Sequence, residues 1–297
     1  MLPFRPVTID DKETFRLFFD KVAFGNCDFS FSNIFCWRHS YDTTFAVEDD
    51  FLYIRFQPPE SLPGYLFPAG AGDLGAAIGR MERDAQERGT ELRLYAVTQK
   101  MFDLLEGAMP GRFRFEKDRD WYEYIYSATD LVALAGNKYQ AKRNHINKFR
   151  RTYKWEYLPV TREIIPDCMA LYERWCAENG GCDSAETLAE ERMATGNAFQ
   201  NFERLGLTGG ALRIDGEILA YSYGQPLTHD IFGVHAEKCL YEIAGGFTMI
   251  NREFVEHNCA GYTYINREED LGLESLRQSK LSYHPAFLLE KGWVRPK

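Results

Sequence analysis

The residues best suited to proton transfer lie in the stretch DIFGVHAE at 230–237. Alternation along a strand predicts that His235 and Glu237 share one face, whereas the apolar side chains share the other: Phe232, Val234 and Ala236. A strand face that ends in His and Glu could open into a cleft where a base draws a proton from a nucleophile. A polar, solvent-facing strand edge explains the pattern equally well. Tyr221 and Tyr223 alternate in the same way on the preceding strand, where they could line the same cavity or serve only for packing.

A second dense polar group is INREEDLG at 265–272, between a predicted strand and a predicted helix. Its acids lie where a helix dipole favours negative charge, so helix capping is one explanation. The other is a cluster that binds an ammonium group or draws a proton from it, formed by Asn266, Arg267, Glu268, Glu269 and Asp270. Arg277 and Lys280 are spaced i, i+3 on the next helix and should share a face.

Two glycine patterns could bind an anion, and the sequence supports one of them better than the other. Gly245 and Gly246 open a predicted helix, whose backbone N–H groups and dipole suit an anion, although an ordinary loop is an equal alternative. The sequence GAGDLG at 70–75 fits the GxGxxG pattern of dinucleotide sites. That site needs the glycines directly after a strand and an acid at the end of the next strand. Here Pro68 intervenes and Glu91 precedes its strand, which favours a simple turn and helix start.

Metal binding is not supported by the sequence. His235-Ala-Glu237 resembles the HxE half of a zinc deaminase signature, but no PCxxC follows to supply further ligands. The cysteines form no CxxC pair, and their number is odd: 27, 36, 168, 176, 182, 239 and 259. This pattern favours reduced thiols that pack as small hydrophobic groups in a cytoplasmic protein.

The segment NKYQAKRNHINKFRRTYK at 137–154 carries seven basic residues and no acid, in a chain of formal charge −9. The rest of the chain then holds 28 basic against 44 acidic residues, so contact with phosphates must be local. Helical spacing predicts that Lys142 and Arg143 face a bound phosphate while Ile146 and Phe149 anchor the helix to the core. A solvated linker helix is the alternative.

The elements around these groups alternate between strands and helices, as in an α/β protein. Three runs at 207–214, 217–225 and 230–237 predict consecutive antiparallel strands, with Asp215-Gly216 as the first turn. We expect residues 153–297 to form one mixed sheet, ending in the strand AFLLEKGWV. A similar order of elements before and after the basic segment suggests internal duplication. An acid-rich helical stretch, DSAETLAEERM, suggests a solvated face.

At 297 residues, about two domains are expected, and aromatic residues at 15% imply a well-filled core. The N-terminal sequence MLPFRPVTIDDKE lacks an apolar signal region, and no run approaches the roughly 18 apolar residues of a membrane span. These features predict a cytoplasmic protein.

Three long segments together resemble the phosphatidylglycerol lysyltransferase C-terminal-like family: KYQAKRNHINKF, AGGFTMINREF and YINREEDLGLESLRQSKLSYHPAFLLEKG. The resemblance extends over most of the chain and is strongest from about 130 to the end. It implies mixed α/β sheets in two tandem GNAT-like (acyl-CoA N-acyltransferase-like) domains, at 1–135 and 153–297, joined by a basic helix at 136–152. Relatives of this kind transfer an amino acid from aminoacyl-tRNA to a lipid headgroup or peptide.

Two departures from the family pattern affect the expected substrates. The lysyltransferases carry a membrane-embedded region that this sequence lacks, which weakens a lipid acceptor. The Gln/Arg-x-x-Gly-x-Gly/Ala loop of acetyl-CoA enzymes is also missing around LYEIAGGF, which weakens acyl-CoA as the donor and favours aminoacyl-tRNA.

We therefore expect an acyltransferase that moves an aminoacyl group from tRNA to an amine or hydroxyl of a small molecule, peptide or lipid, without a metal or redox cofactor. A CoA-dependent N-acetyltransferase and a non-catalytic GNAT-like binding module are the alternatives. The expected catalytic residues are His235, Glu237 and Glu269. The expected substrate-binding residues are Lys142, Arg143, Tyr223, Gly245, Gly246, Asn266, Asp270, Arg277 and Lys280.

Overall fold

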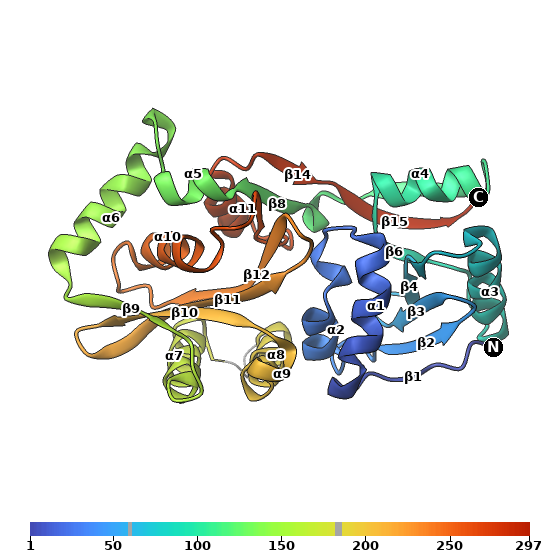
Figure 1. Cartoon of the computed structure of the whole chain (residues 1–297), viewed down its shortest axis with the longest axis horizontal. Coiled ribbons are helices and arrows are strands. Elements are labelled where there is room, and N and C mark those ends of the chain that lie inside the picture. Colours follow the sequence, from blue (N-terminus) through green and yellow to red (C-terminus); the bar gives the residue numbers. More distant parts are fainter. Residues whose placement is uncertain (59–60, 182–185) are drawn as a thin grey trace. The chain divides into compact units, whose positions relative to one another are not determined.

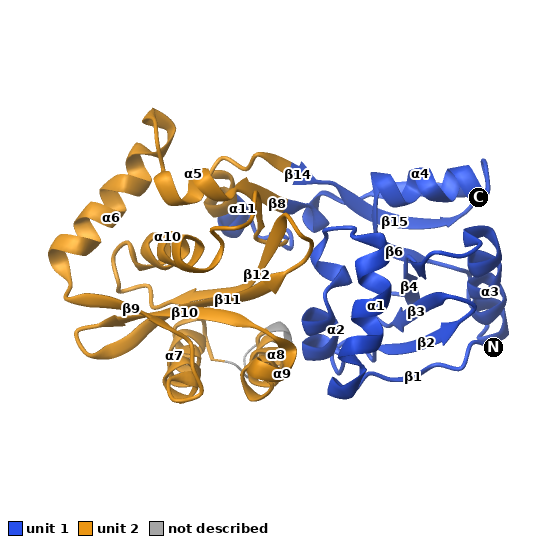
Figure 2. Cartoon of the chain, viewed as in Figure 1, with its two compact units in different colours: residues 1–123, 269–277, 288–297 blue, residues 124–268, 278–287 orange. Residues whose placement is uncertain are grey.

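The computed structural model describes residues 1–58, 61–181 and 186–297, and the chain forms two compact units (Figures 1 and 2). Unit 1 comprises 1–123, 269–277 and 288–297, and unit 2 comprises 124–268 and 278–287. Neither unit is a continuous segment, so the units do not coincide with the expected ranges 1–135, 136–152 and 153–297. Among the described residues, no helix is both long and apolar enough to cross a membrane.

Unit 1 is built on an eight-stranded sheet of order β1-β2-β3-β4-β6-β15-β7, with β5 paired to β3. Its strands are β1 Arg5–Pro6, β2 Thr44–Glu48, β3 Phe51–Phe56, β4 Gly64–Leu66, β5 Ala69–Gly70, β6 Leu94–Thr98, β7 Phe113–Lys117 and β15 Lys291–Pro296. Its helices are α1 Lys12–Val22, α2 Phe31–Trp37, α3 Leu74–Glu87 and α4 Gln99–Ala108. Phe15 of α1 is fully buried, and its ring lies edge-on to Phe31 and tilted against Phe45, so the aromatic residues fill this core as expected.

Unit 2 is built on a seven-stranded sheet of order β14-β8-β13-β12-β11-β10-β9. Its strands are β8 Glu123–Ser127, β9 Trp155–Pro159, β10 Thr208–Ile214, β11 Glu217–Pro226, β12 Ile231–Cys239, β13 Tyr264–Asn266 and β14 Phe287–Leu289. The helices are α5 Ala128–Ala133, α6 Gln140–Thr152, α7 Ile165–Glu178, α8 Glu186–Gln200, α9 Phe202–Leu205 and α10 Gly246–Asn258. Helix α11, Glu274–Leu281, has its first four residues in unit 1 and its last four in unit 2. In Figure 1, α6 and α10 lie on one side of this sheet and α7, α8 and α9 on the other.

The three central strands of unit 2 confirm the predicted order. β10, β11 and β12 are consecutive and antiparallel. Asp215 and Gly216 both have positive φ, at 52° and 97°, as a two-residue type I′ turn requires. The basic segment is helical over Gln140–Thr152, and Ile146 and Phe149 are buried in the core as predicted.

The expectation of one sheet over 153–297 is wrong at both ends. β8, which precedes the basic segment, belongs to the sheet of unit 2. The expected last strand divides into β14 in that sheet and β15 in the sheet of unit 1, where β15 pairs with β6 and β7. A Cβ at Gly292 would come within 2.0 Å of the Glu116 carbonyl oxygen, so β15 packs too closely on β7 for a side chain there. A run of apolar residues does not reveal which of two sheets it will join.

The cysteines follow the expectation in part. Five of them are buried free thiols: Cys27, Cys36, Cys168, Cys239 and Cys259. Cys176 is disulfide-bonded, which corrects the expectation that every cysteine is reduced. Cys182 and residues 183–185 of the expected acid-rich stretch lie outside the described residues.

Candidate functional site

A β-bulge in β12 decides which side chains share a face. Tyr223 of β11 pairs with Ala236, but the next residue, Gly224, pairs with Val234, so His235 is the extra residue on β12. A bulge re-aims side chains and reverses the alternation beyond it. The expected grouping of Ala236 with Phe232 and Val234 is therefore wrong.

Tyr223 lies opposite Ala236 and packs against Phe199 and Phe202, with ring centroids 5.4 and 6.2 Å apart. Directly paired residues share a face, whereas Glu237 points the opposite way from Ala236. The expectation that Tyr223 lines one cavity with Glu237 is therefore wrong.

The carboxylate of Glu237 lies in a network of unit 2 that reaches three elements. Arg267, just after β13, donates from Nη2 to Glu237 Oε1 at 3.0 Å. Asn251 of α10 donates from Nδ2 to Glu237 Oε2 at 2.9 Å. The side chains of Glu237 and Arg267 are only 11% and 10% exposed, so this is a largely desolvated ion pair.

Two polar atoms of this network have no hydrogen-bond partner among the described residues: Arg267 Nη1 and Asn251 Oδ1. Both atoms are buried, and an unpaired buried donor or acceptor costs about 1–3 kcal/mol. The guanidinium of Arg267 also lies over the rings of Tyr283 and Tyr126, at 4.8 and 5.5 Å from their centroids. The network thus holds one donor and one acceptor ready for an additional group.

Lys142 of α6 belongs to the same environment. Its ammonium lies 3.6 Å from the ring centroid of Tyr283 and donates to Ser282 Oγ at 2.7 Å. Burial, reinforced by the nearby positive charge of Arg267, lowers the pKa of Lys142 to about 8, against the opposing influence of Glu237. We call Lys142, Glu237, Asn251, Arg267 and Tyr283 the Glu237 cluster.

Lys280 supports this cluster through the backbone. Its Nζ donates to the carbonyl of Arg267 at 2.5 Å, and Tyr126 Oη donates to the carbonyl of Lys280 at 2.8 Å. Lys280 is buried. Its position fits a residue that fixes Arg267 better than one that meets a substrate.

His235 and Glu268 form a second polar pair in unit 2. His235 Nδ1 lies 2.8 Å from Glu268 Oε1, and the histidine side chain is only 5% exposed. Glu268 has a φ of 57°, in the left-handed region that non-glycine residues rarely adopt, and its N–H donates to Asn266 Oδ1. Asn266 is therefore a turn-forming residue. A carboxylate that orients a histidine is the usual support of a histidine general base.

Asp270 and Arg277, expected with the same site, lie in unit 1 and pair with each other. Arg277 donates from Nε and Nη2 to the carboxylate of Asp270, both at 2.8 Å, and from Nη2 to Asp120 at 2.6 Å. Arg119 adds a further bond to Asp270, which is fully buried. Both residues are thus satisfied by partners in unit 1.

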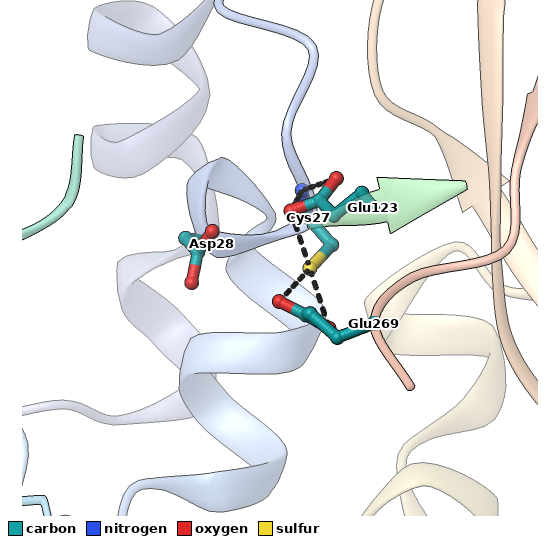
Figure 3. A group of neighbouring side chains, drawn as sticks. All are labelled: Cys27, Asp28, Glu123 and Glu269. Carbon is teal, nitrogen blue, oxygen red and sulfur yellow. Dashed lines mark hydrogen bonds between the residues drawn. The ribbon is translucent and has the colours of Figure 1, made fainter. Parts of the chain in front are cut away.

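Glu269 also lies in unit 1, around the buried ammonium of Lys291. That ammonium bonds to Glu269, to Glu123 at 2.5 Å and to Asp28 at 2.6 Å. Figure 3 shows Cys27 between the carboxylates of Glu123 and Glu269, and its thiol donates to both. We call these five residues the Lys291 cluster.

The charges of the Lys291 cluster balance one another in part. Burial alone would lower the pKa of Lys291, but the surrounding carboxylates raise it well above its usual range. Burial, together with Glu123 and Glu269, raises the pKa of Cys27, which keeps the thiol protonated. Ligand atoms of Cys27, Asp28, Glu123 and Glu269 lie within 4.8 Å of one another, as a metal site would require. The Lys291 ammonium already holds the position that a cation would take among the carboxylates.

Gly245 and Gly246 are explained by close packing in unit 2. Gly245 has a φ of 84°, and a Cβ there would lie 2.7 Å from the carbonyl oxygen of His145 on α6. A Cβ on Gly246 would lie 2.3 Å from Cys239 Sγ. The pair lets the start of α10 contact α6 and β12, and anion binding at this terminus stays a prediction.

Arg143 has a local role. Its Nη1 donates to the carbonyls of Leu134 and Gly136 at 2.5 and 2.7 Å, and its Nη2 donates to Gln140. It therefore caps the end of α5, and its phosphate contact stays a prediction.

Asn251, Tyr283 and Lys291 were missed by sequence reasoning, and Arg267 was noticed only as part of INREED. Asn251 lies in the quoted AGGFTMINREF segment, but nothing in its local pattern distinguishes it from a surface asparagine. Lys291 is buried although it stands beside Glu290 in the run AFLLEKGWV, and a charged residue within such an apolar run is the signal that could have indicated a buried, paired lysine.

Comparison with known proteins gives the family. The family model described as phosphatidylglycerol lysyltransferase, C-terminal, matches residues 19–293. A crystal structure of a conserved protein of unknown function from Bacteroides thetaiotaomicron is 46% identical, covers all of both chains and has a TM-score of 0.94. An uncharacterized protein of Mycoplasmoides gallisepticum is 25% identical over 177 residues, which are 58% of this chain and only 55% of that protein.

Two more distant structures show the fold. The C-terminal domain of a putative lysylphosphatidylglycerol synthetase from Agrobacterium fabrum is 13% identical, with a TM-score of 0.67 over 97% of this chain and 92% of that one. A tandem GNAT protein from the clavulanic acid biosynthesis pathway is 10% identical, with a TM-score of 0.51 over 100% and 98% of the two chains. The predicted fold, mixed α/β with two GNAT-like domains, is confirmed. Family and fold are those of aminoacyltransferase-type acyltransferases, and because the family model matches well over half of the sequence, the chain belongs to the phosphatidylglycerol lysyltransferase C-terminal family.

Proposed function

We propose that this chain transfers an aminoacyl group from aminoacyl-tRNA to an amine or hydroxyl acceptor, and that the Glu237 cluster binds the aminoacyl ester. The family supports acyl transfer in general. The observation that carries the assignment of the site is a pair of buried atoms, Arg267 Nη1 and Asn251 Oδ1, that have no hydrogen-bond partner in the described part of the chain. Both residues bond to Glu237, and the Lys142 ammonium lies close enough to feel the charge of Arg267. Such a combination suits a ligand that offers both a carbonyl oxygen and an ammonium group.

The positive groups would act on the ester carbonyl. The acceptor forms a bond to the carbonyl carbon, negative charge develops on the carbonyl oxygen, and the bond to the ribose oxygen of the tRNA then breaks. Arg267 Nη1 donates a hydrogen bond to the developing oxyanion, and the charge of Lys142 stabilises it. Preorganised donors of this kind contribute about 2.7–4 kcal/mol each in acyl transfer.

The acceptor atoms of the cluster would hold the ammonium group of the same ligand. Asn251 Oδ1 accepts a hydrogen bond from it, and the carboxylate of Glu237 attracts its charge. Glu237 is already fixed by Arg267 and Asn251, so we assign it to binding and orientation. Fixed geometry of this kind lowers the entropic cost of reaching the transition state.

His235, oriented by Glu268, would take the proton from the attacking amine or hydroxyl. The ribose oxygen that leaves takes up a proton in exchange, so the transfer needs no redox partner. General base catalysis contributes typically 10²–10⁴-fold.

The test is single-turnover transfer from a mixture of radiolabelled aminoacyl-tRNAs, with phosphatidylglycerol vesicles, a pentapeptide and free amino acids as candidate acceptors. The proposal predicts enzyme-dependent loss of label from tRNA and its appearance in one acceptor. Arg267→Lys should slow the transfer at least about 100-fold, because lysine cannot reproduce the guanidinium fork. Arg295→Lys, at a partly exposed arginine paired with Glu116, is the matched control and should retain the wild-type rate. Acetylation of the same acceptors from acetyl-CoA, with charged tRNA left intact, would contradict the proposal.

A further inference from the structure

The seven cations of the basic segment fall into two groups once their contacts are known. Four of them are engaged within unit 2. Lys142 contacts Ser282 and Tyr283, and Arg143 caps the end of α5. Lys138 pairs with Asp130, and Arg150 pairs with the buried Glu253, each at 3.5 Å.

The other three cations, Lys148, Arg151 and Lys154, make no ion pair with any acid in the described ranges. All three are exposed and follow one another at a spacing of three residues. Lys148 and Arg151 line an open depression on α6 together with Asn144, Asn147 and Thr152. Residues three and four apart share a helix face, so Asn144, Asn147, Lys148 and Arg151 form one polar strip on α6, and Lys154 follows two residues after the helix ends at Thr152. We call Asn144, Asn147, Lys148, Arg151 and Lys154 the α6 strip.

An anionic membrane surface is a less suitable partner for this strip than a phosphate backbone. Helices that lie on membranes expose apolar side chains beside their basic residues. The large apolar side chains of α6, Ile146 and Phe149, are instead buried in the core of unit 2. None of the large hydrophobic residues found exposed in the described part of the chain lies within 137–154.

We infer that the α6 strip binds the phosphate backbone of RNA. The amides of Asn144 and Asn147 and the charges of Lys148, Arg151 and Lys154 are the groups that contact phosphate oxygens without reading sequence. Because the chain as a whole is acidic, RNA should bind only at a local strip whose cations have no ion-pair partner in the described part of the chain. The inference rests on the proposed function, because the RNA would be the tRNA part of the donor. The phosphate contact, which was expected at Lys142 and Arg143, is thereby assigned to the C-terminal half of α6.

The test compares Lys148→Ala/Arg151→Ala with a matched control, Lys21→Ala/Arg83→Ala, which removes the same charge from exposed helix positions of unit 1. Binding of uncharged total tRNA is measured by fluorescence anisotropy over a series of salt concentrations. Circular dichroism and the melting temperature confirm that all variants are folded. The α6 variant should reduce the slope of log K against log salt by about 1.4–1.8, since each of the two lost phosphate contacts removes about 0.7–0.9 from it. At the lowest salt its Kd should rise at least tenfold, while the control keeps the wild-type slope.

A second measurement separates failure of this inference from failure of the proposed function. An aminoacyl ester of adenosine carries the reactive ester without phosphates, so the α6 variant should use it at the wild-type rate while its use of aminoacyl-tRNA falls. If the wild type binds tRNA through the strip but transfers from neither donor, the proposed function fails and the RNA surface stands. An unchanged slope in the α6 variant would overturn the inference. Loss of binding to anionic lipid vesicles, with tRNA binding intact, would overturn it as well and assign the strip to membranes.

Discussion

The Lys291 cluster of unit 1 and the Glu237 cluster of unit 2 contain similar charged groups but differ in how completely these groups are paired. Each places a buried cation against carboxylate. In unit 1, the Lys291 ammonium bonds to three carboxylates, and the neighbouring thiol donates to two of them. In unit 2, Arg267 meets one carboxylate and keeps Nη1 unpartnered among the described residues, as does Asn251 with Oδ1.

The difference separates a structural centre from a candidate binding site. Buried polar groups are destabilising when they are left unpaired, so a network whose groups bond to one another supports the fold. A network with an unpaired donor and an unpaired acceptor is destabilised by them in the unbound protein. A bound ligand that pairs with both atoms removes this destabilisation. Three of the residues expected to act together, Glu269, Asp270 and Arg277, fall on the structural side of this division.

The largest effect should follow from Lys291→Met. Removing the ammonium leaves the buried Glu123 and the partly buried Asp28 and Glu269 together without a counter-charge, which should destabilise the protein by about 3–5 kcal/mol. Urea denaturation at pH 7 measures this effect. An unchanged stability at pH 7 would show that the Lys291 cluster does not hold unit 1 together.

Asn251→Ala should have the opposite profile. It removes one hydrogen bond to Glu237, worth about 1 kcal/mol, and an acceptor that has no described protein partner. We expect kcat/KM to fall about 10–100-fold, with a loss of unfolding free energy of about 1–2 kcal/mol, smaller than that of Lys291→Met. Steady-state kinetics and urea denaturation of the same preparation give both values. A large loss of stability with normal kinetics would show that Asn251 has a purely structural role.

Lys142→Met tests the Glu237 cluster through the pH dependence of the unfolding free energy. The pKa of Lys142 is lowered to about 8 in the folded protein, so between pH 8 and 10.5 the unfolded chain binds more protons than the folded one. This group therefore makes stability rise with pH across that window, and its burial is unfavourable throughout the range below pH 8. After allowance for solvent screening, Lys142→Met should stabilise the protein by about 1 kcal/mol at pH 7, with a smaller gain above pH 8.

The wild-type transfer rate should fall as pH rises through about 8, since the neutral amine no longer stabilises an oxyanion. Lys142→Met should lower the rate about tenfold and lose this pH dependence. A rate that rises through pH 8 in the wild type and stays flat in the variant would assign Lys142 to proton abstraction instead.

Cys27→Ser should have the smallest effect. The hydroxyl can donate to the same carboxylates, so stability should change by about 1 kcal/mol or less and transfer should be unaffected. Thermal denaturation and the transfer assay check this together. A loss of transfer at constant stability would bring the Lys291 cluster into the chemistry.

Local sequence rules predicted the elements of unit 2 well. The alternation at 207–237, the Asp215-Gly216 turn and the Ile146 and Phe149 anchors of the basic helix depend on contacts near in sequence or on patterns of fixed period. The same rules failed beyond His235. One extra residue in a strand moves the side chains that follow it to the opposite face of the sheet, and the amino-acid composition does not indicate where a bulge occurs.

The candidate site was predicted only in part, because its partners are distant in sequence. Glu237, Lys142 and Lys280 were named from their segments, but Asn251 and Tyr283 join them through tertiary packing alone. Glu268 and Glu269 are adjacent in the sequence and were expected to act together. Glu268 pairs with His235 in unit 2, whereas Glu269 pairs with Lys291 in unit 1, a division that follows from chain topology.

The most direct test of the account is the binding of an aminoacyl-adenosine analogue in which an amide replaces the ester, measured by isothermal titration calorimetry. Wild type, Arg267→Lys and Glu269→Gln are compared at one pH, with the melting temperature of each variant as a check of folding. If the Glu237 cluster binds the aminoacyl group, Arg267→Lys should weaken binding at least about 50-fold, whereas Glu269→Gln should leave the Kd within about twofold of the wild type even if it lowers the melting temperature. Weak binding by Glu269→Gln together with wild-type binding by Arg267→Lys would contradict it.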